Sequence, residues 1–128
     1  MVADRKPLRC LVADDEVQIG SLLRDALAHH GYVTDIVADG ESAARRLAEQ
    51  DYALLVTDVL MPIRTGVELV RDLRAKGKET PVVLMSSFLS EEVLVACSKM
   101  EHIAFLQKPF SLSDLRRAVE RANSSIRC

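Results

Sequence analysis

The sequence predicts an α/β fold, a single doubly wound (βα)5 domain built on a parallel five-stranded sheet. Two observations predict it. Short apolar, β-branched runs alternate with segments of helical period along the chain, and this alternation is typical of repeated strand–helix–strand units. The length of 128 residues also fits one compact domain. We therefore expect one domain over residues 1–128, with a core of about residues 8–122 and no output domain in this chain.

Five apolar runs are the predicted strands. They are residues 8–13, 32–38, 53–57, 81–85 and 102–106. The first, third and fourth are almost continuously apolar, as expected where helices cover both faces of a parallel sheet, so they should be central. The second contains polar residues and the fifth is short, which suits edge positions. Five strands favour the flavodoxin-like order 2-1-3-4-5 over the other common doubly wound order.

The segments between these runs have the apolar period of helices. The predicted inner faces of the first two are Val17, Leu22, Leu23, Ala26 and Leu27, and then Ala43, Ala44, Leu47 and Ala48. The first should end near Gly31, and the third should span about residues 66–76. Ser90 is the predicted start of the fourth, and Ser111 with Asp114 resembles a capping box for the fifth.

Composition excludes several classes of function. The net charge of −2 argues against binding nucleic acid through bulk electrostatics, so we expect no direct nucleic-acid contact. The longest apolar runs are far below the roughly 20 residues that span a bilayer, and the first nine residues lack the apolar region of a signal peptide. We expect a cytoplasmic protein without membrane insertion. Cys10 and Cys97 should be small buried hydrophobes, and Cys128 ends the chain.

Polar residues follow the predicted strands at the edge where doubly wound sheets bind ligands. They are Asp14, Asp15 and Glu16 after the first strand, Asp58 after the third, Ser86 and Ser87 after the fourth, and Lys108 after the fifth. The first and third strands should be neighbours, so Asp14, Asp15 and Asp58 should converge. Clustered carboxylates repel one another unless a cation neutralises them. All-oxygen ligands indicate Mg²⁺ or Mn²⁺, because the chain offers no Cys or His cluster for zinc.

Together these residues favour phosphoryl chemistry. Asp58 can act as the nucleophile that forms an acyl phosphate, with Lys108 and Ser86 contacting the phosphoryl oxygens. Each residue alone has a plainer interpretation: Asp15 as the N-cap of the first helix, Asp58 as a turn former, Lys108 as a solvated loop lysine. The combination carries the hypothesis, because four strands end in these residue types at one edge.

Four motifs resemble the receiver domain of response regulators, the family of the chemotaxis response regulator, over about residues 8–121. They read LVADDE at residues 11–16, LLVTDVLMP at 54–62 with Gly66 following, VVLMSS at 82–87, and AFLQKPF at 104–110. The resemblance implies that Asp58 is phosphorylated by a histidine kinase or a phosphotransfer protein. It further implies that the change switches binding of a downstream partner.

The resemblance also assigns roles to the other site residues. Asp15 and Asp58 would bind the metal directly, Asp14 through water, and Leu60 through its backbone carbonyl. The phosphoryl-contacting residues would be Ser86, Ser87 and Lys108, with Ser86 and Phe105 forming the switch pair. The bond between Lys108 and Pro109 would be cis.

Partner binding is expected, by the same resemblance, on the fourth helix, fifth strand and fifth helix, in a monomer or a phosphorylation-dependent dimer. The protein would not be an enzyme. It would be a switch that promotes its own Mg²⁺-dependent phosphorylation and dephosphorylation.

Several positions depart from the usual family pattern. Leu60 and Phe88, two residues beyond Asp58 and Ser86, are both large and apolar. We predict that they shield the acyl phosphate from water and slow its hydrolysis. Residues 63–65 before Gly66, and residues 100–101 before the fifth strand, also differ from the usual pattern, which leaves those loop shapes open.

Three other classes of function remain as alternatives. An interaction module with an inert site is one. A haloacid-dehalogenase-type phosphatase is another, although its Asp-x-Asp motif differs from the adjacent Asp14 and Asp15. A flavodoxin is the third, although an acidic first loop would repel the flavin phosphate. The sequence also leaves open whether the chain acts alone or belongs to a hybrid histidine kinase.

Overall fold

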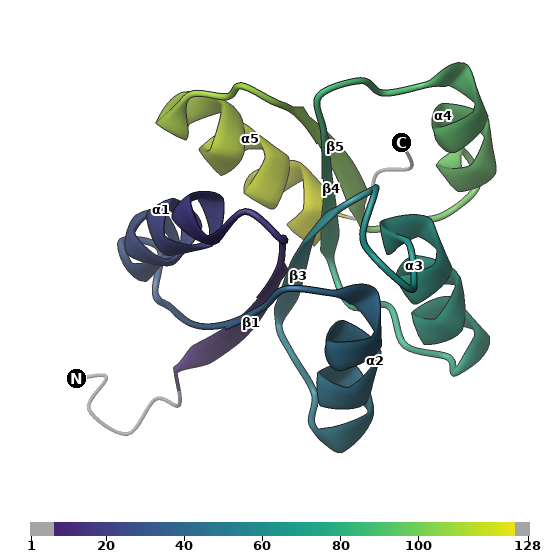
Figure 1. The fold of residues 1–128 in the computed structure, drawn as a ribbon, viewed down its shortest axis with the longest axis horizontal. Coiled ribbons are helices and arrows are strands. Elements are labelled where there is room, and N and C mark those ends of the chain that lie inside the picture. The colour runs from purple at the N-terminus through teal and green to yellow at the C-terminus, as the bar shows by residue number, and fades with distance from the viewer. Residues whose placement is uncertain (1–6, 125–128) are drawn as a thin grey trace.

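The computed structural model describes residues 7–124 as five strands and five helices in strict alternation (Figure 1). Their bounds, in chain order, are β1 Leu8–Ala13, α1 Val17–Ala28, β2 Tyr32–Val37, α2 Gly40–Glu49, β3 Leu54–Asp58, α3 Gly66–Ala75, β4 Val82–Ser86, α4 Glu91–Cys97, β5 Ile103–Gln107 and α5 Leu112–Asn123. The predicted strands and helices are all present, and most strand bounds differ from the prediction by one residue.

The strands form one parallel sheet of order β2-β1-β3-β4-β5, which confirms the predicted fold class and strand order. Parallel pairing runs throughout, and β1 lies between β2 and β3 with Ala13 opposite both Val37 and Thr57. The three central strands are almost entirely buried, whereas β2 at one edge has polar and half-buried positions. Burial on both faces explains why the central strands have continuously apolar sequences.

Two apolar layers fill the space between the sheet and the helices. Leu23 and Leu27 of α1 pack with α5 on one face, and the inner residues of α2, α3 and α4 pack on the other. Figure 1 shows this division, with α1 and α5 on one side of the sheet and the other helices opposite. Cys10 and Cys97 are fully buried as predicted, while Cys128 lies outside the described residues.

Part of the predicted helix faces is wrong. Val17 and Leu22 are 76% and 49% exposed, and Ala48 is also exposed. Val17 is the first residue of α1, where the helix begins and few neighbouring residues can cover its side chain. Leu22 precedes the buried Leu23, and Ala48 follows the buried Leu47. Neighbouring residues in a helix point about 100° apart, so a residue next to a buried one can be exposed.

Side-chain caps determine where several helices begin. Ser90 accepts a hydrogen bond from the Val93 amide at the start of α4, and Ser111 and Asp114 form the predicted capping box of α5. At the other end of α1, Gly31 has a φ of 87°, a backbone conformation that favours glycine. No helix within residues 7–124 has the length and apolar character needed to cross a membrane.

Candidate functional site

The ends of β1 and β3 bring Asp14 and Asp58 together. Asp14 follows β1 directly and continues its pairing with β2, because its amide donates to the Val37 carbonyl over 3.1 Å. Asp58 is the last residue of β3 and pairs with Met85 of β4. Since β1 and β3 are neighbours, both side chains reach the same edge of the sheet.

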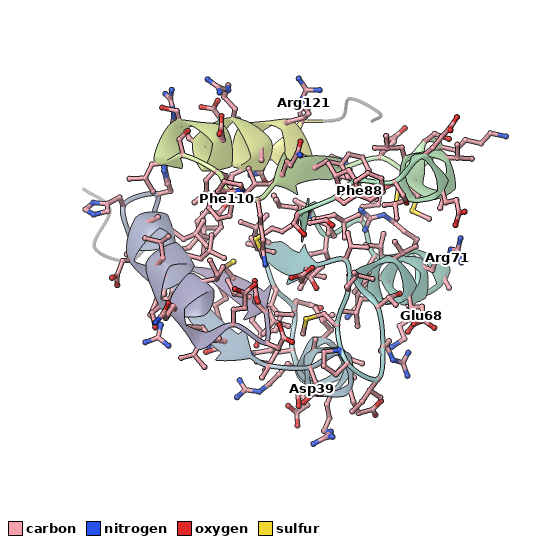
Figure 2. All side chains as sticks on the ribbon, turned by 45° about the horizontal axis from the view of Figure 1, so that its top comes forward. Asp39, Glu68, Arg71, Phe88, Phe110 and Arg121 are labelled. Atoms are coloured by element: carbon pink, nitrogen blue, oxygen red, sulfur yellow. The ribbon has the colours of Figure 1, made fainter. Side chains whose placement is uncertain are left out.

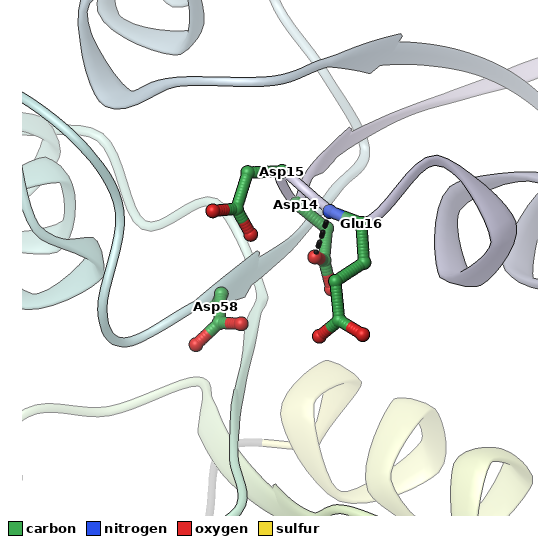
Figure 3. Close-up of side chains that lie close together, drawn as sticks. All are labelled: Asp14, Asp15, Glu16 and Asp58. Atoms are coloured by element: carbon green, nitrogen blue, oxygen red, sulfur yellow. Dashed lines mark hydrogen bonds between the residues drawn. The ribbon is translucent and has the colours of Figure 1, made fainter.

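Four carboxylates meet at this edge. One oxygen from each of Asp14, Asp15, Glu16 and Asp58 lies within 4.8 Å of the others, and Figure 3 shows the four side chains converging from two strand ends. Asp14 is buried and Asp58 partly buried, whereas Asp15 and Glu16 are exposed. The group is therefore a shallow acidic pocket with two sheltered and two open members.

Lys108 lies among these carboxylates. Its ammonium donates to Asp58 Oδ2 at 2.8 Å, to Asp14 Oδ2 at 2.9 Å and to Glu16 Oε1 at 3.2 Å. Burial alone would lower the pKa of Lys108, but the hydrogen bonds and charges of Asp58 and Asp14 outweigh it and raise that pKa. Lys108 is therefore held as a cation against the two sheltered carboxylates.

Backbone amides hold the other carboxylate oxygens. The Leu60 amide donates to Asp58 Oδ1 at 3.1 Å, and the Glu16 amide donates to Asp14 Oδ1 at 2.8 Å. The plainer interpretation of Asp15 as the N-cap of α1 is wrong: Glu16 holds that position, and its side chain makes no capping bond. The acidic residues after β1 serve the pocket and not the helix.

Backbone contacts also fix the position of Lys108. Its amide donates to the Ser86 carbonyl at 2.8 Å, which ties the end of β5 to the end of β4. The peptide bond between Lys108 and Pro109 is cis, as the resemblance implies. The chain therefore leaves β5 with the lysine at the carboxyl edge.

Ser86 is in place, but its hydroxyl points elsewhere. The hydroxyl donates to the Phe88 carbonyl at 2.8 Å and accepts from the Phe88 amide at 3.1 Å. The residue is buried, and these bonds satisfy its polar group locally. Ser87 is exposed beside it. In this structure the Ser86 hydroxyl therefore closes a turn on Phe88.

The remaining predicted residues, Phe105, Leu60 and Phe88, are not part of the carboxylate group. Phe105, in the middle of β5, is partly buried against the core. Leu60 and Phe88 are 73% and 77% exposed, on the loops that follow β3 and β4; Phe88 is labelled in Figure 2. All three are carried by segments that leave or flank the strand ends of the pocket.

Gly66 allows the start of α3 to pass close to the backbone of Asp58. A Cβ at this position would lie 2.6 Å from the Asp58 carbonyl oxygen, a distance too short for any side chain. The Gly66 amide also donates to the Val59 carbonyl at 3.0 Å, closing the loop that begins at Asp58. This explains the glycine of the motif in physical terms.

The donor set fits a hard divalent cation. Carboxylate oxygens, here from Asp14, Asp15 and Asp58, are the ligands that Mg²⁺ prefers. Sequence reasoning assigned no role to Glu16, although the structure places it in the same group. Its position directly after Asp15 was the available signal, but a residue at a helix start can point in several directions.

Comparisons with known proteins agree with this geometry. Residues 10–120 match the family described as Response regulator receiver domain. The transcriptional regulatory protein RprY of Bacteroides fragilis is 30% identical over 120 residues, which cover 94% of this chain and 51% of RprY. The chain thus spans about half the length of that relative.

Solved structures show the same likeness. The chemotaxis response regulator CheY4 of Vibrio cholerae superimposes with a TM-score of 0.79 at 25% identity, covering 91% of this chain and 99% of CheY4. The receiver domain of the sensor histidine kinase PA1611 from Pseudomonas aeruginosa has a TM-score of 0.76 at 25% identity, covering 93% of this chain and all of that domain. That structure has a magnesium ion coordinated in its active-site cleft. The chain belongs to the receiver domain family of two-component response regulators.

Proposed function

We propose that the chain is a single receiver domain that accepts a phosphoryl group on Asp58 from a phosphohistidine of a histidine kinase or phosphotransfer protein. One Asp58 oxygen forms a bond to phosphorus while the phosphorus–nitrogen bond of the donor breaks. The imidazole leaves with the electron pair and takes up a proton from water. The observation that carries the proposal is the position of the Asp58 carboxylate, beside three other carboxylates and bonded to Lys108.

Asp14, Asp15, Asp58 and the Leu60 carbonyl would hold Mg²⁺, or Mn²⁺ in its place. The ion supplies positive charge that screens the incoming phosphoryl group from the carboxylates. With the carboxylates neutralised, Lys108 exchanges its bond to Asp58 for one to a phosphoryl oxygen. The Leu60 amide keeps the other Asp58 oxygen oriented. The chain thus promotes its own phosphorylation and, with water as acceptor, its dephosphorylation.

The acquired phosphoryl group is sensed by Ser86, Ser87 and Phe105. The Ser86 hydroxyl leaves the Phe88 carbonyl and binds a phosphoryl oxygen, and Phe105 moves further inward. Phe105 also lines a groove of about 920 Å³ between α4, β5 and α5. A downstream partner, or a second phosphorylated copy of the chain, would bind this face. We place this signalling in the cytoplasm by the same resemblance.

Leu60 and Phe88 would prolong the life of the acyl phosphate. Each is large, apolar and carried on a loop beside the pocket, so together they can exclude water from the phosphorus atom. Replacing both, with Leu60→Asn and Phe88→Glu, should shorten the phosphorylated lifetime. The lifetime is measured by the loss of phosphate from purified labelled protein. An unchanged lifetime would refute this role.

Labelling with a small phosphodonor tests the main proposal. Acetyl phosphate with Mg²⁺ should add one phosphoryl group to the intact protein, as measured by mass spectrometry. EDTA or Asp58→Asn should abolish the addition. The matched control is Asp51→Asn, an exposed aspartate whose ion-pair partner is Lys78. A folded wild-type protein that takes up no phosphate would refute the proposal and favour an interaction module.

A further inference from the structure

The loop between β3 and α3 is held mainly by polar contacts in its second half. Val59 and Met61 are buried and anchor its first half in the core. Beyond them, Pro62 and Ile63 are exposed and Arg64 is half-buried. This second half contains the residues that differ from the family pattern, and it connects Leu60 to the helix that begins at Gly66.

The backbone of this segment has a strained turn. Ile63 has a φ of 74°, and the Arg64 amide donates to the Pro62 carbonyl at 2.8 Å. A hydrogen bond across one residue with positive φ defines the rare, strained form of the γ-turn. For a β-branched residue such as Ile63 this conformation is unfavourable. Contacts elsewhere must therefore hold the turn in place.

The first turn of α2 provides one of these contacts. The Gly40 amide donates to the same Pro62 carbonyl at 3.1 Å. A Cβ on Gly40 would lie only 2.0 Å from the Arg64 carbonyl oxygen, so the two backbones touch. Asp39 and Glu68, labelled in Figure 2, lie at the starts of α2 and α3. The loop leads into α3 and contacts the first turn of α2.

The Arg64 side chain links both helices. Its guanidinium is hydrogen-bonded to Asp72 of α3 and lies 3.7 Å from the Glu41 carboxylate of α2. An arginine presents several donors in a rigid fork, so one side chain can hold two carboxylates. The three side chains are 35% to 48% exposed, which makes these ion pairs modest and sensitive to salt.

We propose that Arg64 is a positioning residue for the metal-binding loop. By linking α2 to α3 across the strained turn at Ile63, it holds the loop that carries Leu60, whose amide donates to Asp58 Oδ1 in the pocket. The role of Leu60 as a ligand rests on the proposed function. The positioning of the loop does not, and it can be measured without phosphate.

Arg64→Met tests this role, because it keeps an unbranched apolar stem and removes the guanidinium donors. Arg46→Met is the matched control: Arg46 is also partly exposed and pairs with Asp35, in the middle of β2. In the metal-free protein, Arg64→Met should accelerate hydrogen exchange of the Gly40 and Gly66 amides, and Arg46→Met should leave both unchanged.

Mg²⁺ affinity is the second readout, measured by calorimetric titration. Arg64→Met should raise the dissociation constant roughly two- to fivefold, the value expected for half-exposed ion pairs. This ratio should fall toward one in concentrated NaCl, because salt screens the pairs. The proposal would be overturned if Arg64→Met kept the wild-type rates of amide hydrogen exchange and the wild-type Mg²⁺ affinity. It would also be overturned if Arg46→Met changed both quantities equally. If acetyl phosphate fails to label the wild type, only the proposed function fails.

Discussion

The floor of the acidic pocket and the loops around it are built differently. The floor residues Asp14, Asp58 and Lys108 come directly from strand ends, and their side chains are at most 13% exposed. The loop residues Leu60, Ile63 and Phe88 are more than 70% exposed. The pairing of the sheet fixes the first group, whereas the second depends on local turns. Chemistry that needs fixed distances is thus placed on strands, and adaptable contacts are placed on loops.

Lys108→Met should have the largest effect on stability, because it leaves two sheltered carboxylates without their cation. We expect the free energy of unfolding to fall by about 2–4 kcal/mol in EDTA, as measured by urea denaturation. Mg²⁺ should recover part of the loss. Arg117→Met is the control, because its ion pair with Asp114 is on the surface. If Lys108→Met lost no more stability than Arg117→Met, the sheltered carboxylates would not depend on Lys108.

The pH dependence of this loss has a definite sign. Folding raises the pKa of Lys108 above its ordinary value of 10.5. The stabilisation is therefore complete below pH 10.5 and is lost only as the pH rises through the higher folded value. The difference between Lys108→Met and the wild type should thus stay constant between about pH 7 and pH 9.

Gly66→Ala should have the next largest effect. Its Cβ would lie 2.6 Å from a backbone oxygen of Asp58, which cannot move without disturbing β3. We expect a loss of about 1–3 kcal/mol and weaker Mg²⁺ binding. Gly20→Ala is the control, because its Cβ would meet only the Ile36 side chain, at 2.9 Å. Equal losses of stability in the two variants would show that the close approach of Gly66 to Asp58 adds no constraint beyond that of a buried helical glycine.

Ile63→Gly should stabilise the protein slightly. The turn at Ile63 has a positive φ, which costs roughly 1–2 kcal/mol for an L-residue. Glycine removes this cost but destabilises the protein by about 0.5–1 kcal/mol, because its unfolded state has more conformational entropy. A net gain of about 0.5–1 kcal/mol is expected in thermal or urea unfolding. Ile63→Ala keeps the Cβ and should give no such gain. If alanine stabilises as much as glycine, the strain lies elsewhere.

Phe88→Ala should have the smallest effect on stability. The side chain is 77% exposed, so the free energy of unfolding should change by no more than about 0.5 kcal/mol. The same holds for Leu60→Ala. A loss above 1 kcal/mol in either variant would mean that the loop residues take part in the core, and the contrast with the floor would then fail.

The sequence was sufficient to predict the fold and the floor of the pocket. Alternating apolar runs and helical periods reflect burial over many residues, so an error of one residue at a strand end changes little. Asp14, Asp58 and Lys108 could be placed together because strand order determines which ends meet. Motifs that recur in the family then assigned their roles.

Loop geometry could not be predicted in the same way. The γ-turn at Ile63, the turn of the Ser86 hydroxyl toward Phe88 and the bridging by Arg64 each depend on one or two specific contacts. His102, which also has a positive φ, adjoins the other segment where the family pattern is not followed. Single-residue preferences are too weak to determine such conformations, because tertiary contacts decide between them.

The most direct test of the account is the position of the phosphoryl group. Protein labelled with acetyl phosphate and Mg²⁺ is reduced with borohydride, which converts an aspartyl phosphate to homoserine, and the peptides are sequenced by mass spectrometry. Homoserine is expected at position 58 alone. Homoserine at position 14 or 15, or phosphate retained on Ser86 or Ser87, would contradict it.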